Sequence, residues 1–270
     1  MHKVQYYKIY GGIGNQLFQY AHGISEIKKG KNVRFILNRD FSLKVFNDLP
    51  ELFTINPDLV FIPKNKFELF LAKAFAKYIC KSWHTGFFQD FNFAEFIKTE
   101  NIQFLKKKEY ENTEVASFFS KNDVISIHIR GGDYNRADVF ADYGNICTKD
   151  YYTKAINEVF SKFENPIFIV FSNDKKYAES ILTNIKNSEF IFADELKEKC
   201  SESIKTDPAF DMYLQTLCKS NIIANSTFSW WGAFLNETPQ KLVISPSKWH
   251  NKRPQAIKEI IPNYSGWRKI

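Results

Sequence analysis

The chain has 270 residues, of which 44% are hydrophobic and 17% aromatic, so we expect a large folded core and not a disordered chain. The net charge is +7, but the lysines form only short clusters, which is weak support for a nucleic-acid groove. The four cysteines contain no C-x-x-C pair, so neither a zinc site nor a thioredoxin-like motif is supported, and we expect reduced thiols in a cytoplasmic protein.

The N-terminal third begins with a strand–helix–strand pattern. Residues 4–10 predict a strand, 11–14 a glycine turn, and apolar residues at helical spacing a helix from about Asn15. Residues 33–37 predict the next strand. The region 40–114 contains one clear helical stretch at 67–81, which is too short and too charged to cross a bilayer.

A regular alternation of strands and helices follows. The predicted strands are 124–129, 167–171, 190–192, 222–224 and 242–244, and the predicted helices are 151–163, 175–185, 211–219 and one from about 229. This alternation predicts an α/β protein with parallel sheets. We expect two Rossmann-like domains, 1–145 and 146–270, facing each other across a cleft at the C-terminal ends of their strands.

The glycine turn carries Gly11-Gly12-Ile13-Gly14-Asn15-Gln16. It is not a dinucleotide fingerprint, because Leu17 replaces the third glycine, and it lacks the Gly-Lys-Ser/Thr of a P-loop. Two interpretations of this turn remain: a structural tight turn and a ligand-binding loop. Asn15 and Gln16 favour the ligand loop, because their amides can donate to sugar or phosphate oxygens.

A second motif, His128-Ile129-Arg130-Gly131-Gly132-Asp133-Tyr134, follows a buried strand. Arg130 offers a permanently charged fork of donors that suits phosphate oxygens. Its alternative role is an ion pair with Asp133 that pins the turn. His128 alternates with isoleucines, so a buried core histidine is its alternative.

The third motif is the segment from Asn225 to Phe234, which contains Ser226-Thr227-Phe228-Ser229-Trp230-Trp231. It predicts a buried strand ending in a Ser/Thr turn that opens a helix, where hydroxyls and free N–H groups form an anion site. The tryptophans are interpreted as core packing. Asp174 and Asp211 each precede or open a helix, so simple N-caps are their alternative role.

No metal site is predicted, because the sequence has no D-x-D motif and no histidine pair at ligand spacing. A bound diphosphate would then be neutralised by Arg130, helix N-termini and hydroxyl groups.

Together these motifs resemble the bacterial α-1,2-fucosyltransferase family. Residues 11–21 resemble its G-G-x-G-N-Q-x-F-Q-Y-A, 128–134 its H-x-R-R-G-D-Y, 211–214 its D-M-x-L, and 225–233 its N-S-T-F-S-W-W-G-A. The resemblance covers residues 11–249. One departure is Gly131, which stands where the family has a second arginine, while Arg130 is kept.

The resemblance implies a GT-B fold and metal-independent, inverting transfer of L-fucose from GDP-β-L-fucose to the 2-hydroxyl of a galactose, with no cofactor. Domain 1–145 would then be the acceptor side, and domain 146–270 would bind the GDP-sugar. Its implied partners are GDP-fucose and a galactose-terminated glycan or lipid-linked oligosaccharide, without nucleic acid. We expect a cytoplasmic enzyme, with peripheral contact with the inner membrane face left open. Another acceptor hydroxyl, another GDP-sugar, an NAD-dependent oxidoreductase and a non-catalytic glycan- or nucleic-acid-binding protein remain alternatives.

The resemblance also assigns residue roles. Arg130 would neutralise the departing GDP, and Asn15 would lie beside the fucose or the β-phosphate. The resemblance assigns no base. Asp133 and Asp138 are the nearest carboxylates to the arginine motif and are the candidates, and a loose transition state that needs little help from a base is the alternative. The implied donor-binding residues are Gly14, His128, Asp174, Asp211, Ser226, Thr227, Phe228 and Ser229.

Overall fold

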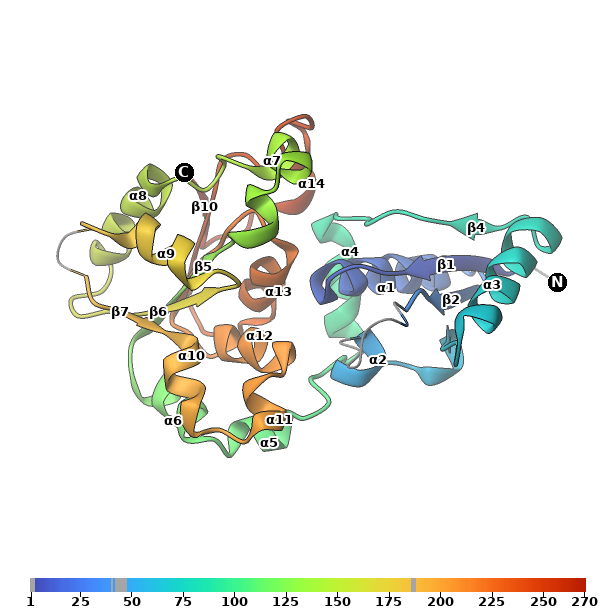
Figure 1. The fold of residues 1–270 in the computed structure, drawn as a ribbon, viewed down its shortest axis with the longest axis horizontal. Coiled ribbons are helices and arrows are strands. Elements are labelled where there is room, and N and C mark those ends of the chain that lie inside the picture. The colour runs from blue at the N-terminus through green and yellow to red at the C-terminus, as the bar shows by residue number, and fades with distance from the viewer. Residues whose placement is uncertain (1–2, 40, 42–47, 186–187) are drawn as a thin grey trace. The chain divides into compact units, whose positions relative to one another are not determined.

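The structure, a computed structural model, describes residues 3–39, 41, 48–185 and 188–270, with Asp133 and Asn135 described by their backbone only. The chain divides into two compact units, Met1–Lys106 and Lys107–Ile270, which Figure 1 shows as separate sheets with their helices. Each unit is described by itself. None of the helices in the described ranges has the length and apolarity needed to cross a membrane.

In the described part of the first unit, four parallel strands form a sheet of order β3-β2-β1-β4. The strands are β1 (Gln5–Ile9), β2 (Val33–Leu37), β3 (Val60–Phe61) and β4 (Trp83–His84). The helices are α1 (Ile13–Lys28), α2 (Leu49–Leu52), the 3-10 helix η1 (Pro57–Leu59), α3 (Lys66–Ala74), the π-helix η2 (Phe75–Ile79) and α4 (Phe91–Thr99).

Helices cover both faces of this first sheet because alternate strand residues point to opposite sides. On one face Phe35 lies 4.9 Å from the ring of Tyr20 on α1. Gly23 of α1 permits this close packing, since a Cβ there would lie 2.2 Å from the Phe35 ring. On the other face, Ile36 packs with Leu69 and Ala76 of α3 and η2.

In residues 107–185 and 188–270, six parallel strands form the second sheet, of order β10-β9-β8-β5-β6-β7. The strands are β5 (Val124–Ile129), β6 (Ile167–Ser172), β7 (Phe190–Phe192), β8 (Ser220–Ile222), β9 (Leu242–Ser245) and β10 (Trp267–Lys269). The helices are α5 (Lys107–Glu111), α6 (Glu114–Lys121), η3 (Gly132–Asn135), α7 (Ala137–Tyr143), α8 (Lys149–Phe160), α9 (Lys175–Leu182), α10 (Ala193–Leu196), η4 (Lys197–Lys199), α11 (Glu202–Lys205), α12 (Pro208–Thr216), α13 (Thr227–Leu235) and α14 (Ala256–Ile260).

This second sheet has the strand order of a Rossmann fold, with β5 as its first strand and the direction of winding reversing between β5 and β8. All six residues of β5 are buried, as expected for a central parallel strand. Ile125, Ile127 and Ile129 pack with Tyr152 and Ile156 of α8 in one hydrophobic core cluster. Ligands of such sheets bind where the winding reverses, at the C-terminal strand ends.

The expected α/β class with two Rossmann-like units is confirmed. The division between the units lies at 106/107, whereas the sequence suggested 145/146. The difference arises because β5, assigned from sequence to the first domain, pairs with β6 and β8 in the second sheet. As a division between acceptor and donor binding, the expected boundary stays a prediction.

Candidate functional site

Two of the predicted motifs meet at the point where the second sheet reverses its winding. Arg130 follows the end of β5, and the segment 223–226 connects the end of β8 to α13. Figure 1 labels β5 and α13 in this unit. The two strands are neighbours, with Ile127 paired to Ile222. The Tyr134 hydroxyl donates to the Asn225 carbonyl at 3.0 Å, which holds the arginine loop against the Ser/Thr turn.

Aromatic side chains position Arg130. The Cζ atom of its guanidinium lies 5.5 Å from the ring centroid of Tyr134, and the Tyr134 ring stacks on Tyr143 at 5.3 Å. The Tyr152 hydroxyl donates to the His128 carbonyl at 2.9 Å and braces the strand end. A half-buried guanidinium packed on an aromatic ring keeps its orientation, and its N–H groups are donors of the kind that bind phosphate oxygens.

The backbone beside Arg130 is tightly packed. The Gly131 N–H donates to Asn173 Oδ1 at 3.0 Å and the Gly132 N–H donates to Asp174 Oδ2 at 3.2 Å. A Cβ on Gly131 would lie 2.7 Å from Tyr177 Cδ1 and 2.9 Å from Asp174 Cβ. This backbone therefore has no room for the second arginine of the family pattern, because Tyr177 and Asp174 occupy its place.

His128 is 4% exposed, and burial together with the neighbouring Arg130 lowers its pKa to about 3. The imidazole is therefore neutral at physiological pH. Its Nδ1 is buried and has no hydrogen-bond partner in the described part of the chain. The ring lies 5.7 Å from that of Phe228 in the first turn of α13. Both the core-histidine alternative and a role as a ligand contact are compatible with this placement.

Helix α13 begins without a side-chain cap. Ser226 has the extended backbone of an N-cap residue, but within the described residues its side chain makes no capping hydrogen bond. The N–H groups of Phe228 and Ser229 likewise have no acceptor there. Thr227, the first residue of α13, is half-buried, and the role of its hydroxyl in holding a diphosphate stays a prediction. An uncapped N-terminus with a partial positive charge is suited to bind an anion.

Ser229 has a different environment from the other hydroxyl residues of this turn. It is fully buried, and its Oγ donates to the Ser226 carbonyl at 3.3 Å. Its side chain therefore stabilises the turn, while its N–H group still belongs to the open helix end. The expectation that its hydroxyl holds a diphosphate stays a prediction that this geometry does not favour.

The two tryptophans after the turn are core residues, as interpreted from the sequence. Both are fully buried, and Trp230 Nε1 donates to the Ile260 carbonyl at 2.7 Å. Their rings lie 5.1 Å apart, and Trp230 stacks on Phe234 at 4.9 Å. This packing fixes the start of α13 relative to the sheet.

The predicted carboxylates Asp174 and Asp211 have structural partners. Asp174 caps α9 by accepting from the Tyr177 N–H at 3.0 Å, while its other oxygen accepts from Gly132. Asp211 lies on α12 and pairs at 2.6 Å with Lys197, whose side chain is 4% exposed. These contacts fit the N-cap alternative for Asp174 and a counterion role for Asp211. The N-cap alternative for Asp211 is wrong, because α12 begins at Pro208 and is capped by Asp207. The side chain of Asp133 lies outside the described residues.

In the first unit, the glycine turn is held by glutamines that sequence reasoning did not identify as structural. Gln16 is 3% exposed, donates to the Gly11 carbonyl and accepts from the Leu49 N–H, both at 2.9 Å. Gly14 is buried, and Asn15 is half-buried with its Oδ1 accepting from Gln89 at 2.8 Å. Gln16 is therefore a structural residue of the turn, and the ligand role of Asn15 stays a prediction.

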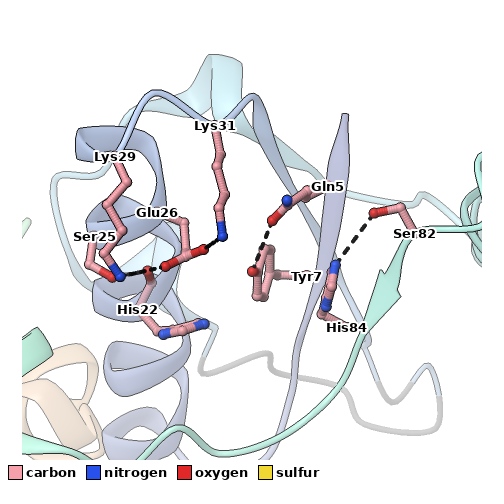
Figure 2. Close-up of polar contacts among 9 residues, drawn as sticks. All are labelled: Gln5, Tyr7, His22, Ser25, Glu26, Lys29, Lys31, Ser82 and His84. Atoms are coloured by element: carbon pink, nitrogen blue, oxygen red, sulfur yellow. Dashed lines mark hydrogen bonds and ion pairs between the residues drawn. The ribbon is translucent and has the colours of Figure 1, made fainter. Parts of the chain in front are cut away.

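A group of titratable residues in the first unit is shown in Figure 2. Glu26 pairs with Lys29 at 2.7 Å and with Lys31. The Tyr7 ring stacks on His84 at 4.6 Å, and burial raises the pKa of Tyr7 to about 12. Burial also lowers the pKa of His22, which stacks on Phe88 at 4.2 Å. These are packed, mostly neutral rings, and no cluster suited to a metal ion occurs among the described residues.

Comparison with known proteins connects this geometry to a family. The profile of glycosyl transferase family 11 matches residues 13–267. Three relatives are similar to the chain. The O-antigen biosynthesis glycosyltransferase WbnK of Escherichia coli is 42% identical over 124 residues, 46% of this chain and 38% of the relative. An α-1,2-colitosyltransferase of Escherichia coli is 27% identical over 97% of both chains. Galactoside α-(1,2)-fucosyltransferase 2 of Pongo pygmaeus is 24% identical over 54% of this chain and 39% of the relative.

The first and third matches thus span less than half of those relatives' length, whereas the second spans nearly all of it.

Among solved structures, fucosyltransferase NodZ from Bradyrhizobium has a TM-score of 0.51 and 11% identity, covering 87% of this chain and 92% of its own. This likeness supports the GT-B-type fold. The family match covers most of the residues and agrees with the motif resemblance. The chain therefore belongs to glycosyl transferase family 11.

Proposed function

We propose that this chain transfers L-fucose from GDP-β-L-fucose to the 2-hydroxyl of a galactose, with inversion and without a metal ion. The observation that carries the proposal is the position of Arg130 beside the uncapped start of α13, at the ends of neighbouring strands. A diphosphate needs several donors of positive or partially positive character, and these two elements supply them at one place.

The proposed reaction is a single displacement. The bond between fucose C1 and the β-phosphate oxygen breaks, and its electron pair leaves with GDP. The galactose O2 bonds to C1 from the opposite face and gives up its proton. Arg130 and the N–H groups of α13 stabilise the charge that develops on the diphosphate, and such stabilisation lowers the barrier because it grows in the transition state.

The base that accepts the galactose proton is a carboxylate close to Arg130 in this proposal. Asp133 remains the candidate because it follows Arg130 closely in the chain. Asp138 is a weaker one, since its two oxygens are held by Arg136 at 3.2 and 2.7 Å. Neutral His128, with its buried Nδ1, is suited to a hydrogen bond with the donor and not to a charge interaction.

The donor sugar has one competing candidate. The relative that matches over 97% of both chains is named an α-1,2-colitosyltransferase, so a GDP-colitose donor is the alternative to GDP-fucose. The relative named for O-antigen biosynthesis supports an acceptor among galactose-containing precursors of surface polysaccharides, including lipid-linked oligosaccharides. A cytoplasmic site of action belongs to the same proposal.

A donor screen tests the proposal. GDP release is measured with GDP-fucose, GDP-colitose, GDP-mannose and UDP-galactose, each with a galactoside and with its 2-deoxy counterpart. We expect release that depends on the galactoside, is lost with the 2-deoxy acceptor, and is unchanged by EDTA. Turnover of GDP-colitose alone would select the alternative donor. Equal turnover with the 2-deoxy acceptor, or EDTA inhibition reversed by Mg²⁺ or Mn²⁺, would contradict the linkage or the metal-free site.

A further inference from the structure

Helix α3 and the π-helix η2 carry a continuous row of exposed apolar side chains on the first unit. We call this row the apolar ridge, and it consists of Phe67, Phe70, Leu71, Phe75, Tyr78 and Ile79, which are 49–72% exposed. The opposite side of the same helices, with Leu69, Ala72 and Ala76, packs on the sheet. The helices are thus apolar on two sides, and the described residues cover only one of them. An exposed apolar row of this size on a folded unit indicates a binding surface.

Lysines flank the ridge. Residues 61–81 contain Lys64, Lys66, Lys73, Lys77 and Lys81 but a single carboxylate, Glu68. Glu68 accepts from the Lys64 N–H at 2.8 Å, and none of the first four lysines forms an ion pair with a carboxylate in the described part of the chain. The Lys77 Nζ lies 5.2 Å from the ring centroid of Tyr78, beside the ridge.

The lysines lie to one side of the ridge because of helical spacing. Lys66, Lys73 and Lys77 recur at intervals of seven and four residues, so they share one side of the helix. The apolar positions recur at intervals of three and four on the neighbouring side. Bulky apolar residues on one side and lysines beside them are the pattern of helices that lie in the interface of a membrane.

We propose that the apolar ridge inserts into the headgroup layer of an anionic phospholipid bilayer, with the flanking lysines against lipid phosphates. Charge complementarity decides between the occupants. A second copy docked through the same face would bring two sets of unpaired lysines together, and like charges repel. An anionic bilayer satisfies both features, because phenylalanine side chains bury in its acyl boundary and lysines are attracted to its surface. This inference does not rest on which sugar the enzyme transfers.

Vesicle co-sedimentation of the full chain tests the proposal. Vesicles of phosphatidylcholine alone are compared with vesicles that contain phosphatidylglycerol, at low and high salt. We expect binding to the anionic vesicles that weakens with salt. Phe67→Ser with Phe70→Ser should lower the partition coefficient at least tenfold. Lys66→Glu with Lys77→Glu should lower it at least as much, since each basic residue contributes about fivefold.

Matched variants separate this surface from general effects. Lys162→Glu with Lys199→Glu makes the same change in net charge at exposed positions of the second unit, and Leu105→Ser removes an apolar side chain that is 53% exposed. Both should bind as the unaltered chain does. Thermal unfolding and turnover of a soluble galactoside should be unchanged in the ridge variants, which keeps this test separate from the donor screen.

Three results would overturn the proposal. The first is equal binding to both kinds of vesicle or binding to neither. The second is an equal loss of binding in the Lys162/Lys199 control. The third is light scattering that shows a dimer dispersed by the Phe67/Phe70 variant without vesicle binding, which would assign the ridge to a second copy of the chain.

Discussion

At the scale of single residues, Arg130 has the environment of a preorganised charge. Its guanidinium packs over Tyr134, whose hydroxyl is itself bonded to Asn225. Such fixing matters because a donor that is already oriented needs no reorganisation during the reaction. Sequence reasoning identified the arginine but not the aromatic support, although the tyrosine that ends the motif was the available signal.

Arg130→Ala should reduce the rate of transfer about 10²–10³-fold, the usual effect of removing one preorganised donor. Arg130→Lys should recover part of the loss, since lysine keeps the charge but not the two-pronged geometry. Acceptor-dependent GDP release and thermal unfolding are measured together. A folded Arg130→Ala variant with near-normal turnover would refute the assigned role.

Gly131 should tolerate no side chain. Gly131→Ala places a Cβ 2.7 Å from Tyr177, and we expect a loss of about 1–3 kcal/mol in unfolding free energy together with reduced kcat/KM, because Arg130 shifts with the strained backbone. Gly12→Ala is the matched stability control, since a Cβ there meets nothing within 4 Å. An unchanged midpoint for Gly131→Ala in a urea titration would show that the site has room for the family's second arginine.

At the scale of elements, the start of α13 differs from the capped starts of α6 and α9. Helices α7 and α14 also begin without a side-chain cap, so the start of α13 is distinguished by its place beside the arginine loop. Thr113 caps α6 by accepting from the Ala116 N–H at 3.0 Å, and Asp174 caps α9 in the same way. Ser226 occupies the corresponding position of α13 without such a bond in the described part of the chain. The uncapped N–H groups at a helix start can bind an anionic ligand, while the missing cap lowers the stability of the helix.

Ser226→Ala should therefore change binding more than stability. Losing a hydrogen bond to a charged phosphate should lower kcat/KM for the donor about tenfold or more, with little change in unfolding free energy. Thr113→Ala should do the opposite, losing about 1 kcal/mol of stability with normal kinetics. Kinetics at varied donor concentration and urea titration of both variants check the contrast. Equal destabilisation of the two would mean that Ser226 acts as an ordinary cap.

Glu26, near the C-terminal end of α1, should make the unfolding free energy depend on pH (Figure 2). Burial alone would raise the pKa of Glu26, but bonds to Lys29 and Lys31 outweigh it and lower the pKa to about 2. A carboxyl with a lowered pKa in the folded state stabilises above its ordinary pKa of 4.5, and this contribution is lost as pH falls from there towards 2. The full shift corresponds to about 3 kcal/mol, and we expect about 1–2 kcal/mol because both lysines are exposed to water.

Urea titrations at pH 6 and pH 3 measure this effect. Glu26→Gln should lose stability at pH 6 and show a smaller drop between the two pH values than the unaltered chain. Glu100→Gln removes the more exposed Lys28 pair and should change the pH dependence less. The same pH-dependent loss in Glu26→Gln and in the unaltered chain would assign the effect to other groups.

At the scale of the whole molecule, the proposed donor contacts are concentrated in the second unit, while Gly14 and Asn15 belong to the first. GDP without acceptor should therefore slow hydrogen exchange at the amides around 226–230 and 130–134 in the full chain, because bound ligand stabilises the state that holds it. Exchange in α3 and η2 should not change. Protection confined to residues 3–39 would place the nucleotide in the wrong unit for this proposal.

The sequence alone determined the alternation of strands and helices in the second unit, and β5 and β7 have their predicted bounds. This was possible because continuous apolar runs and helical periodicity are local signals. Strands β3, β4 and β10 were not predicted. They are only two or three residues long, and β3 lies in the apolar run 59–62 inside the region that was hardest to interpret. The stretch predicted as one helix at 67–81 proved to be α3 followed by a π-helix, with the Cys80 N–H bonded to the Phe75 carbonyl.

The three motifs, read from the sequence, were also enough to indicate the family that the comparisons confirm. Only the tertiary structure decided which sheet contains β5, where the units divide, that Tyr177 fills the space beside Gly131, and that the Ser229 hydroxyl is buried. It also decided that one apolar side of α3 is exposed. The reason is physical: parallel strands and packed side chains find partners that are distant in the chain, and no local pattern of residues records those partners.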